Sequence, residues 1–116
     1  MITKDQARKA HERLFEQALE IIRAKRVDYA NSEDPFANFR MSSFWGIEPW
    51  RGAGIRLMDK LSRFKQLAQK GGVGAVKDES IIDTVVDSIN YVVIMLLLLL
   101  EALGREDLVK KLAGEE

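Results

Sequence analysis

The stretch Glu79 to Leu100, ESIIDTVVDSINYVVIMLLLLL, decides the fold. Glu79, Asp83 and Asp87 recur at every fourth position, and Asn90 follows them. Residues three or four apart share one face of a helix, so these side chains form a polar stripe. The rest of the stretch is apolar, which is typical of a helix inside a core or at an oligomer interface. Buried carboxylates are costly unless a cation, a base or a metal partners them, so the stripe indicates a functional site.

Composition limits what the chain can do. Its 116 residues predict a single domain over residues 1–116. Lys plus Arg and Asp plus Glu are both 18, so bulk charge gives no support for direct DNA binding. The absence of Cys and the single His11 exclude thiolate catalysis, Cys-ligated zinc and a multi-His metal site.

The chain is expected to be cytoplasmic, or to lie in the host cytoplasm if a phage encodes it. Its first residues are charged and contain no apolar signal-peptide region. The uninterrupted apolar run over residues 91–100 is far shorter than the ~20 residues that a bilayer requires. We therefore expect a buried helix and no membrane partner.

Capping and periodicity predict an all-α fold. Thr3 and Gln6 form a capping box, and apolar residues follow at helical spacing. The glycines of GGVG, residues 71–74, are expected to end a later helix. The predicted helices cover residues 4 to 25 or 28, about 55–70, 77 or 78 to 103, and a short C-terminal stretch, 106–113. A bundle of three main helices with one apolar on nearly every side predicts completion by oligomerisation, as a homodimer or homotetramer.

Residues 26–54 read as a long loop that carries most of the aromatic side chains. Loops of this length are uncommon in small domains and are usually functional. A short helical turn around Met41 to Trp45 is compatible with the sequence. The aromatic side chains either pack the loop onto the helices or stack against a base or sugar, with Asp28 and Asn38 forming hydrogen bonds to the ligand. Both interpretations can hold together.

A row of cations accompanies the acidic stripe. Arg56, Lys60 and Arg63 share one face of the helix predicted over residues 55–70. Carboxylates of the stripe suit Mg²⁺ or Mn²⁺, and a basic row opposite a loaded metal site would bind phosphate oxygens. The alternative is that the acidic and basic rows pair with each other and no metal is present.

Four motifs go beyond periodicity. The chain contains K-x-x-D-Y at Lys25 to Tyr29, P-F-x-N-F at Pro35 to Phe39, and D-K-x-x-R at Asp59 to Arg63. The fourth is D-E-S-x-x-D-T-x-x-D-x-x-N-Y at Asp78 to Tyr91. In this order they resemble a phage and bacterial family, the nucleotide modification associated domain of the first type. That family is distantly similar to the MazG-like all-α nucleoside triphosphate pyrophosphohydrolases, which bind magnesium through acidic motifs on two helices. Where those enzymes commonly carry E-x-x-E, this chain has Asp59, Lys60 and Arg63.

The resemblance and the residues together lead to three hypotheses. The first is a magnesium-dependent enzyme that binds and hydrolyses a (deoxy)nucleoside triphosphate or modified nucleotide, in nucleotide metabolism or DNA-base modification. The second is a non-catalytic module that binds or sequesters a nucleotide, and the third is a structural homo-oligomer without a ligand. For the enzyme, the catalytic and metal-binding residues would be Glu79, Asp83 and Asp87, with Asp59 as a further metal ligand. The nucleotide-binding residues would be Lys25, Asp28, Tyr29, Asn38, Phe39, Arg56, Lys60, Arg63 and Asn90.

Overall fold

The molecule is built on one central helix. The computed structural model describes residues 1–28, 34–72 and 80–115; for residues 26–28 it describes the backbone alone. The elements in chain order are α1 (Lys4–Asp28), α2 (Ala37–Arg40), the 3₁₀ helix η1 (Met41–Trp45), α3 (Pro49–Gln69), α4 (Ile81–Ala102) and α5 (Glu106–Leu112). The fold is all-α, as the sequence predicts.

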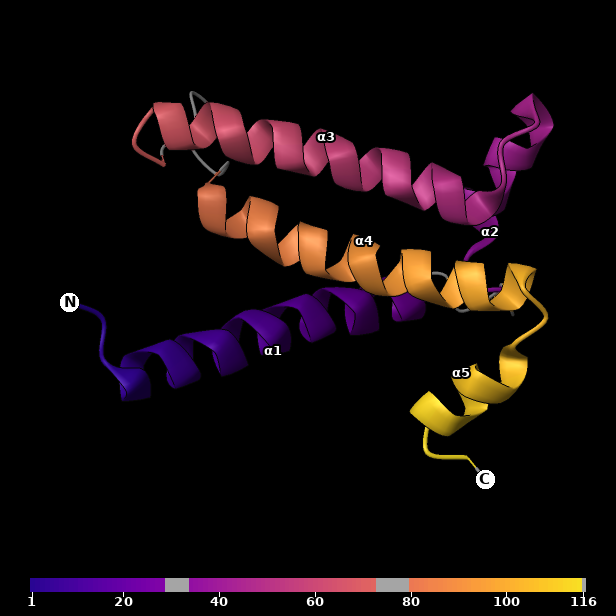
Figure 1. Cartoon of the computed structure of the whole chain (residues 1–116), viewed down its shortest axis with the longest axis horizontal. Helices are drawn as coiled ribbons and strands as arrows, with labels where there is room; N and C mark the ends of the chain where they lie inside the picture. Colours follow the sequence, from indigo (N-terminus) through magenta and orange to yellow (C-terminus); the bar gives the residue numbers. More distant parts are fainter. Residues whose placement is uncertain (29–33, 73–79, 116) are drawn as a thin grey trace.

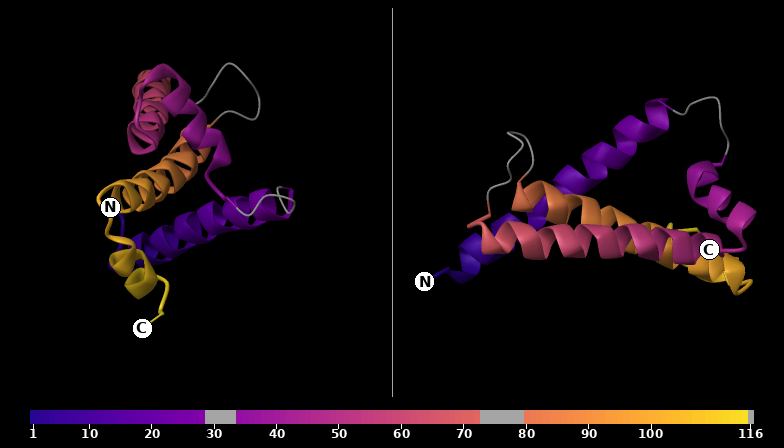
Figure 2. Two further views of the ribbon diagram at one scale, coloured as in Figure 1. Left: turned by 90° about the vertical axis from the view of Figure 1, so that its right-hand side faces the viewer. Right: turned by 90° about the horizontal axis from the view of Figure 1, so that it is seen from above.

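The three long helices α1, α3 and α4 lie roughly side by side, with α4 in the middle (Figures 1 and 2). α3 runs antiparallel to α4 and packs along it, while α1 crosses the opposite side of α4. Within the described residues α1 packs against no other helix than α4. The central helix therefore holds the molecule together, because the other two long helices meet only through it.

The first helix begins as predicted. The backbone N–H of Gln6 donates to Thr3 Oγ1 at 3.1 Å, and the N–H of Thr3 donates to Gln6 Oε1 at 3.1 Å. This reciprocal pair satisfies two N–H groups that have no partner inside the helix. Further along α1, Ala18 is buried, and the side chain of Asn90 on α4 donates to its carbonyl oxygen at 3.0 Å. The alanine allows the two helices to approach closely at this point.

α3 begins at Pro49, six residues before the predicted start at Ile55. The predicted start is wrong because the proline and the glycines of this segment, which are typical of loops, lie in the first turns of the helix. Pro49 occupies the first helical position, where its missing N–H costs nothing. Gly52 and Gly54 lie inside the helix because neighbours come close: an added Cβ would lie 3.0 Å from Ser42 and 3.3 Å from the sulfur of Met95.

The segment predicted as a long loop is partly helical. α2 and η1 form a short double turn, and η1 covers Met41–Trp45, where the sequence allowed a helical turn. η1 ends at Gly46, whose left-handed φ of 73° lets the chain turn back toward α3. Aromatic side chains from this segment are thereby brought next to the first turns of α3.

α4 begins at Ile81, later than the predicted start at Lys77 or Asp78. Ser80 is its N-cap, and its hydroxyl accepts from the backbone N–H of Asp83 at 3.1 Å. Tyr29 and Glu79, which the sequence assigned to the site, lie outside the described residues, as do Asp78 of the fourth motif and the side chain of Asp28.

Among the residues whose side chains the structure describes, few apolar ones are fully covered. Those that are buried lie along the α3–α4 and α1–α4 contacts: Ala18, Ala53, Leu57, Leu67, Val86, Leu98 and Leu100. Large apolar side chains on α1, α3 and α4, among them Phe15, Met58 and Val92, remain more than two-fifths exposed. Among the described helices, α4 is long and apolar enough to cross a membrane by length and composition alone.

Candidate functional site

The described part of the acidic stripe is engaged in contacts within the protein. Asp83 completes the cap of its own helix: its Oδ2 accepts from the Ser80 hydroxyl at 2.8 Å and from the Ser80 backbone N–H at 3.3 Å. One turn later, Asp87 Oδ2 lies 3.0 Å from Lys60 Nζ on α3. Both members of this pair are about one-third exposed. Asp87 and Lys60 therefore meet from facing helices, as the metal-free interpretation of the two rows predicts for this position.

The other residues assigned to metal or phosphate are spread over two helices. Asp59 is exposed on α3 and Lys25 is exposed on α1. Arg63 is half-buried, and its guanidinium donates to Gln66 at 3.5 Å. Among the described residues, no group of three His, Cys, Asp or Glu side chains is arranged to hold a metal ion. Glu79, the first carboxylate of the stripe, lies outside those residues.

Asn90 has a structural contact instead of an open amide. Its Nδ2 donates to the carbonyl oxygen of Ala18, which links α4 to α1. This contact gives the Asn90 amide a structural role without a ligand, because it ties α4 to α1, which packs on no other helix within the described residues.

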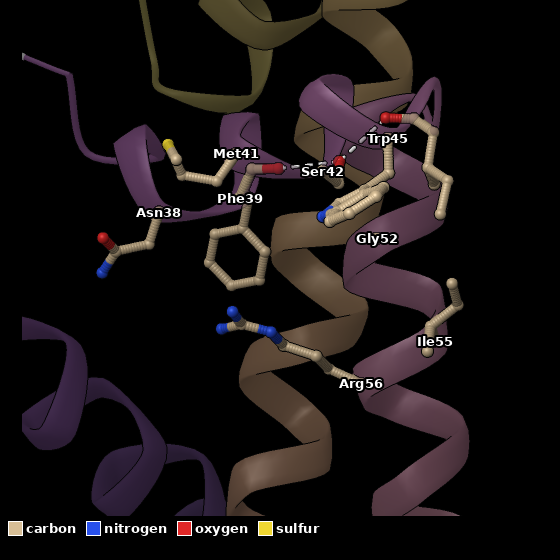
Figure 3. A pocket seen from close by; sticks show the side chains of 9 residues that line it. Asn38, Phe39, Met41, Ser42, Trp45, Gly52, Ile55 and Arg56 are labelled. Atoms are coloured by element: carbon tan, nitrogen blue, oxygen red, sulfur yellow. Dashed lines mark hydrogen bonds between the residues drawn. The ribbon is translucent and has the colours of Figure 1, made fainter.

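Three of the predicted nucleotide-binding residues come together at another place, where α2 and η1 meet the first turns of α3. Asn38, Phe39 and Arg56 line a hollow of about 290 Å³, drawn in Figure 3. We call it the α2–α3 pocket. Its remaining wall consists of Met41, Ser42, Trp45, Ile47, Gly52 and Ile55. The pocket is mainly apolar and aromatic, with one cation and one amide at its edge.

In the α2–α3 pocket, a cation lies against the face of an aromatic ring. The Arg56 guanidinium lies 4.8 Å from the centroid of the Phe39 ring. Tyr91 of α4 contacts the same ring edge to face, with centroids 6.2 Å apart. Figure 3 shows the Phe39 ring with Arg56 beneath it, Asn38 on one side and Trp45 on the other. A cation over an aromatic face is attracted by the negative charge of that face, so Phe39 positions the guanidinium.

The pocket wall is held by Ser42. Its hydroxyl lies 3.0 Å from the carbonyl oxygen of Phe39 and 2.9 Å from that of Ile47. These contacts join the start and the end of the short helical segment. The close approach of Gly52 on α3 then places this segment directly on the helix that carries Arg56.

An ion cluster anchors the same segment to the far end of α4. The Arg40 guanidinium donates to both oxygens of Glu101, at 2.9 and 3.1 Å, and to both oxygens of Asp34. The hydrogen bond from Arg40 and a second from the Phe36 N–H lower the pKa of Asp34 below its usual value. Hydrogen bonds to Glu101 and Asp34 raise the pKa of Arg40, which stays charged at every working pH. Because Arg40 forms two hydrogen bonds with each carboxylate, these contacts fix both the position and the orientation of α2 relative to α4.

Sequence reasoning did not assign Trp45, Met41 or Ile47 to the site individually. The available signal was the density of aromatic residues over residues 26–54, together with the helical turn around Met41 to Trp45. Which of those aromatic side chains would face α3 depends on the left-handed turn at Gly46, and a single sequence does not fix that direction.

Chemically, the pocket suits a flat, partly polar ligand with an anionic group. Aromatic walls stack on planar rings, the Asn38 amide can donate and accept, and arginine matches the geometry of phosphate or carboxylate. Comparisons with protein-family models, with curated proteins and with solved structures give no match to this chain.

Proposed function

We propose that this chain binds a nucleotide in the α2–α3 pocket. The observation that carries the proposal is the Arg56 guanidinium held over Phe39 beside Asn38 and Trp45, around a hollow of about 290 Å³. Pockets for small ligands begin at about 300 Å³, so this one suits a nucleobase more than a larger ligand. The motif resemblance to the nucleotide modification associated family is a second, independent support.

The base would lie against the aromatic side of the pocket. Trp45 contacts Phe44 edge to face, with ring centroids 5.3 Å apart, but is 79% exposed, so the accessible part of its indole can stack. Stacking of a base on an aromatic side chain contributes roughly 1–3 kcal/mol and does not depend strongly on which base is present. Asn38 is exposed at the rim, where its amide can hydrogen-bond a base edge.

The phosphates would extend along α3. Arg56 and Lys60 are one helical turn apart on the same face, about 6 Å along the axis, so a phosphate chain that starts at Arg56 reaches Lys60. Lys60 pairs with Asp87 at 3.0 Å, with both side chains about one-third exposed. Phosphate oxygens compete well for such a lysine because an exposed ion pair contributes only about 0–1 kcal/mol.

Binding without hydrolysis is the better-supported form of this proposal. Asp83 caps its helix and Asp87 pairs with a lysine, so neither is placed as an open carboxylate for magnesium. The hydrolase form requires Lys60 to move onto a phosphate, which would release Asp87 for Mg²⁺ or Mn²⁺. The metal ion would then bind Asp87 only when the nucleotide is also bound.

Calorimetric titration with a panel of ribo- and deoxynucleoside mono-, di- and triphosphates tests the proposal. Arg56→Met should weaken binding at least tenfold, because a hydrogen bond to a charged group contributes about 1.5–3 kcal/mol. Arg51→Met is the matched control, since Arg51 also lies over an aromatic ring, Trp50 at 4.9 Å, but outside the pocket. No binding by the wild type, or equal loss in both variants, would refute the proposal.

A second assay separates the two forms. Chromatography of each nucleotide after incubation with Mg²⁺ or Mn²⁺ should show no product. Release of phosphate or pyrophosphate that is abolished in Asp87→Asn would instead establish hydrolysis and assign that carboxylate to the metal.

A further inference from the structure

An apolar seam runs the length of α4. Its residues are alternately three and four positions apart, which is the spacing of the two core positions in a coiled-coil heptad. They are Ile82, Val85, Ile89, Val92, Leu96, Leu99 and Leu103. We call this row the α4 seam. It extends about 32 Å along the helix, and helices pair through such seams when a partner covers them.

The described residues leave the α4 seam largely uncovered. Ile82, Val92, Leu96 and Leu103 are between 44% and 63% exposed, and the other seam residues are at most half-buried. α3 and α1 pack on α4 but do not bury this row. A long contiguous apolar surface on a soluble domain marks an interaction site.

The molecule exposes more surface than a compact monomer of its mass. The chain exposes 9163 Å². A compact monomer of its 13.2 kDa mass exposes about 6,400 Å². Its radius of gyration is 16.3 Å, against about 13.4 Å for a compact domain of this length. The excess of about 2,700 Å² is at least what one partner contributes to an obligate dimer, roughly 1,000–2,500 Å².

We infer that a second copy of this chain covers the α4 seam, with the two α4 helices antiparallel. A groove of about 380 Å³ supports this orientation. It opens beside the N-terminal half of the seam, where Val85 and Ile89 form one wall and α1 forms the other. The α1 wall consists of Ala7, Ala10, His11, Leu14 and Phe15.

An antiparallel pair fills this groove and a parallel pair does not. The N-terminal half of the seam is β-branched, and the C-terminal half is leucine. An antiparallel arrangement sets Leu96 and Leu99 of one copy against Val85 and Ile89 of the other, beside the groove. A parallel arrangement would place the shorter side chains of both copies opposite each other and leave two grooves empty. Antiparallel helix dipoles add a smaller contribution in the same direction.

Light scattering with a matched pair of substitutions tests the association. The wild type should have twice the 13.2 kDa chain mass. Val92→Asp, in the middle of the seam, should halve the mass with the helical circular dichroism spectrum retained. Leu112→Asp places the same charge on an exposed α5 residue, 66% accessible, and should leave the dimer intact. A wild-type monomer, or a dimer that survives Val92→Asp, overturns the inference.

Cross-linking tests the orientation and does not require Val92→Asp to fold. The chain has no cysteine, so each introduced thiol is unique. With a short bismaleimide, Val92→Cys should cross-link efficiently because it lies near the middle of the seam. Ile82→Cys should not, because its two copies would lie more than ~20 Å apart along the axis. Equal cross-linking at both positions would establish a parallel pair.

A lipid membrane could also cover an apolar helix. A vesicle flotation assay distinguishes this possibility from a second copy of the chain. The wild type mixed with phosphatidylcholine vesicles should stay in the dense fraction. Flotation with the vesicles would replace the second copy by a lipid surface.

Discussion

Replacement of Gly52 by alanine should open the α2–α3 pocket at its base. In an ordinary helix interior, glycine to alanine stabilises by roughly 0.5–1 kcal/mol because the unfolded chain loses freedom. At this position the new Cβ would lie 3.0 Å from both Cβ and Oγ of Ser42. Carbon atoms in contact prefer about 3.5–4.0 Å, so Ser42 must move away.

The cost follows from what holds Ser42 in place. Its hydroxyl contacts two backbone carbonyl oxygens, at 3.0 and 2.9 Å. A hydrogen bond contributes about 0.5–1.5 kcal/mol. Losing that interaction and opening the α3 contact cancels the helix gain, and we expect a net loss of about 1 kcal/mol, or roughly 4 °C in Tm.

Gly54→Ala provides the internal control. Its Cβ would meet only the sulfur of Met95 at 3.3 Å, and a methionine side chain shifts at little cost. Gly54→Ala should therefore gain about 0.5 kcal/mol, while Gly52→Ala loses stability and nucleotide affinity together. Urea denaturation and calorimetry measure the two quantities. Equal stabilisation by both alanines would refute the argument that Gly52 marks a necessary close approach.

Two further predictions concern the contacts that hold the segments together. The hydrogen bond from Arg40 lowers the pKa of Asp34 from its ordinary value of 3.8. The contribution of Asp34 to stability is therefore present above about pH 4, and it is lost as the pH falls through the lowered pKa of the folded state. The Tm difference between wild type and Asp34→Asn should stay constant from pH 7 to about 5 and shrink toward pH 3; a constant difference down to pH 3 would contradict it. Asn90→Ala removes the bond to the Ala18 carbonyl between helices and should cost about 1 kcal/mol in urea denaturation. Ser88→Ala, which removes a bond within α4, should cost less than half as much, and an equal loss would count against the role of Asn90.

Local signals in the sequence predicted most of the helical framework. The Thr3–Gln6 capping box fixes the start of α1 because its partners lie within one turn of each other. Gly71 and Gly72 end α3 with left-handed φ values of 73° and 84°, which glycine adopts at no steric cost. These features depend only on neighbouring residues, so they can be predicted without knowledge of the tertiary fold.

The errors arose where distant residues decide the local structure. In the sequence, Gly52 and Gly54 indicate a loop. In the structure they lie in a helix, where the close approach of Ser42 and Met95 favours a residue without a side chain. The role of Asp83 as a metal ligand, which its spacing with Asp87 suggests, stays a prediction. Ser80, three residues before it, is an equally good signal for a capping box, which the structure contains.

The sequence indicated only part of the α2–α3 pocket, for a similar reason. Asn38, Phe39 and Arg56 do meet, but in a pocket centred on η1 and the start of α3 instead of along the acidic stripe. The sequence alone does not show that Arg40 contacts Glu101, sixty-one positions away. This contact helps to hold α2 beside α3. The location of the pocket depends on this long-range ion cluster.

The two proposals are compatible because they use opposite sides of α4. Each residue turns a helix by about 100°, so Asp87 and Val92, five positions apart, point about 140° away from each other. Asp87 faces Lys60 on the side where a nucleotide's phosphates would run. A second copy on the α4 seam would therefore leave that side and the α2–α3 pocket open. The side of α4 that packs on α3 and α1 carries Asp87 and Asn90 among buried apolar residues, and a second copy would cover the exposed apolar seam on the other side.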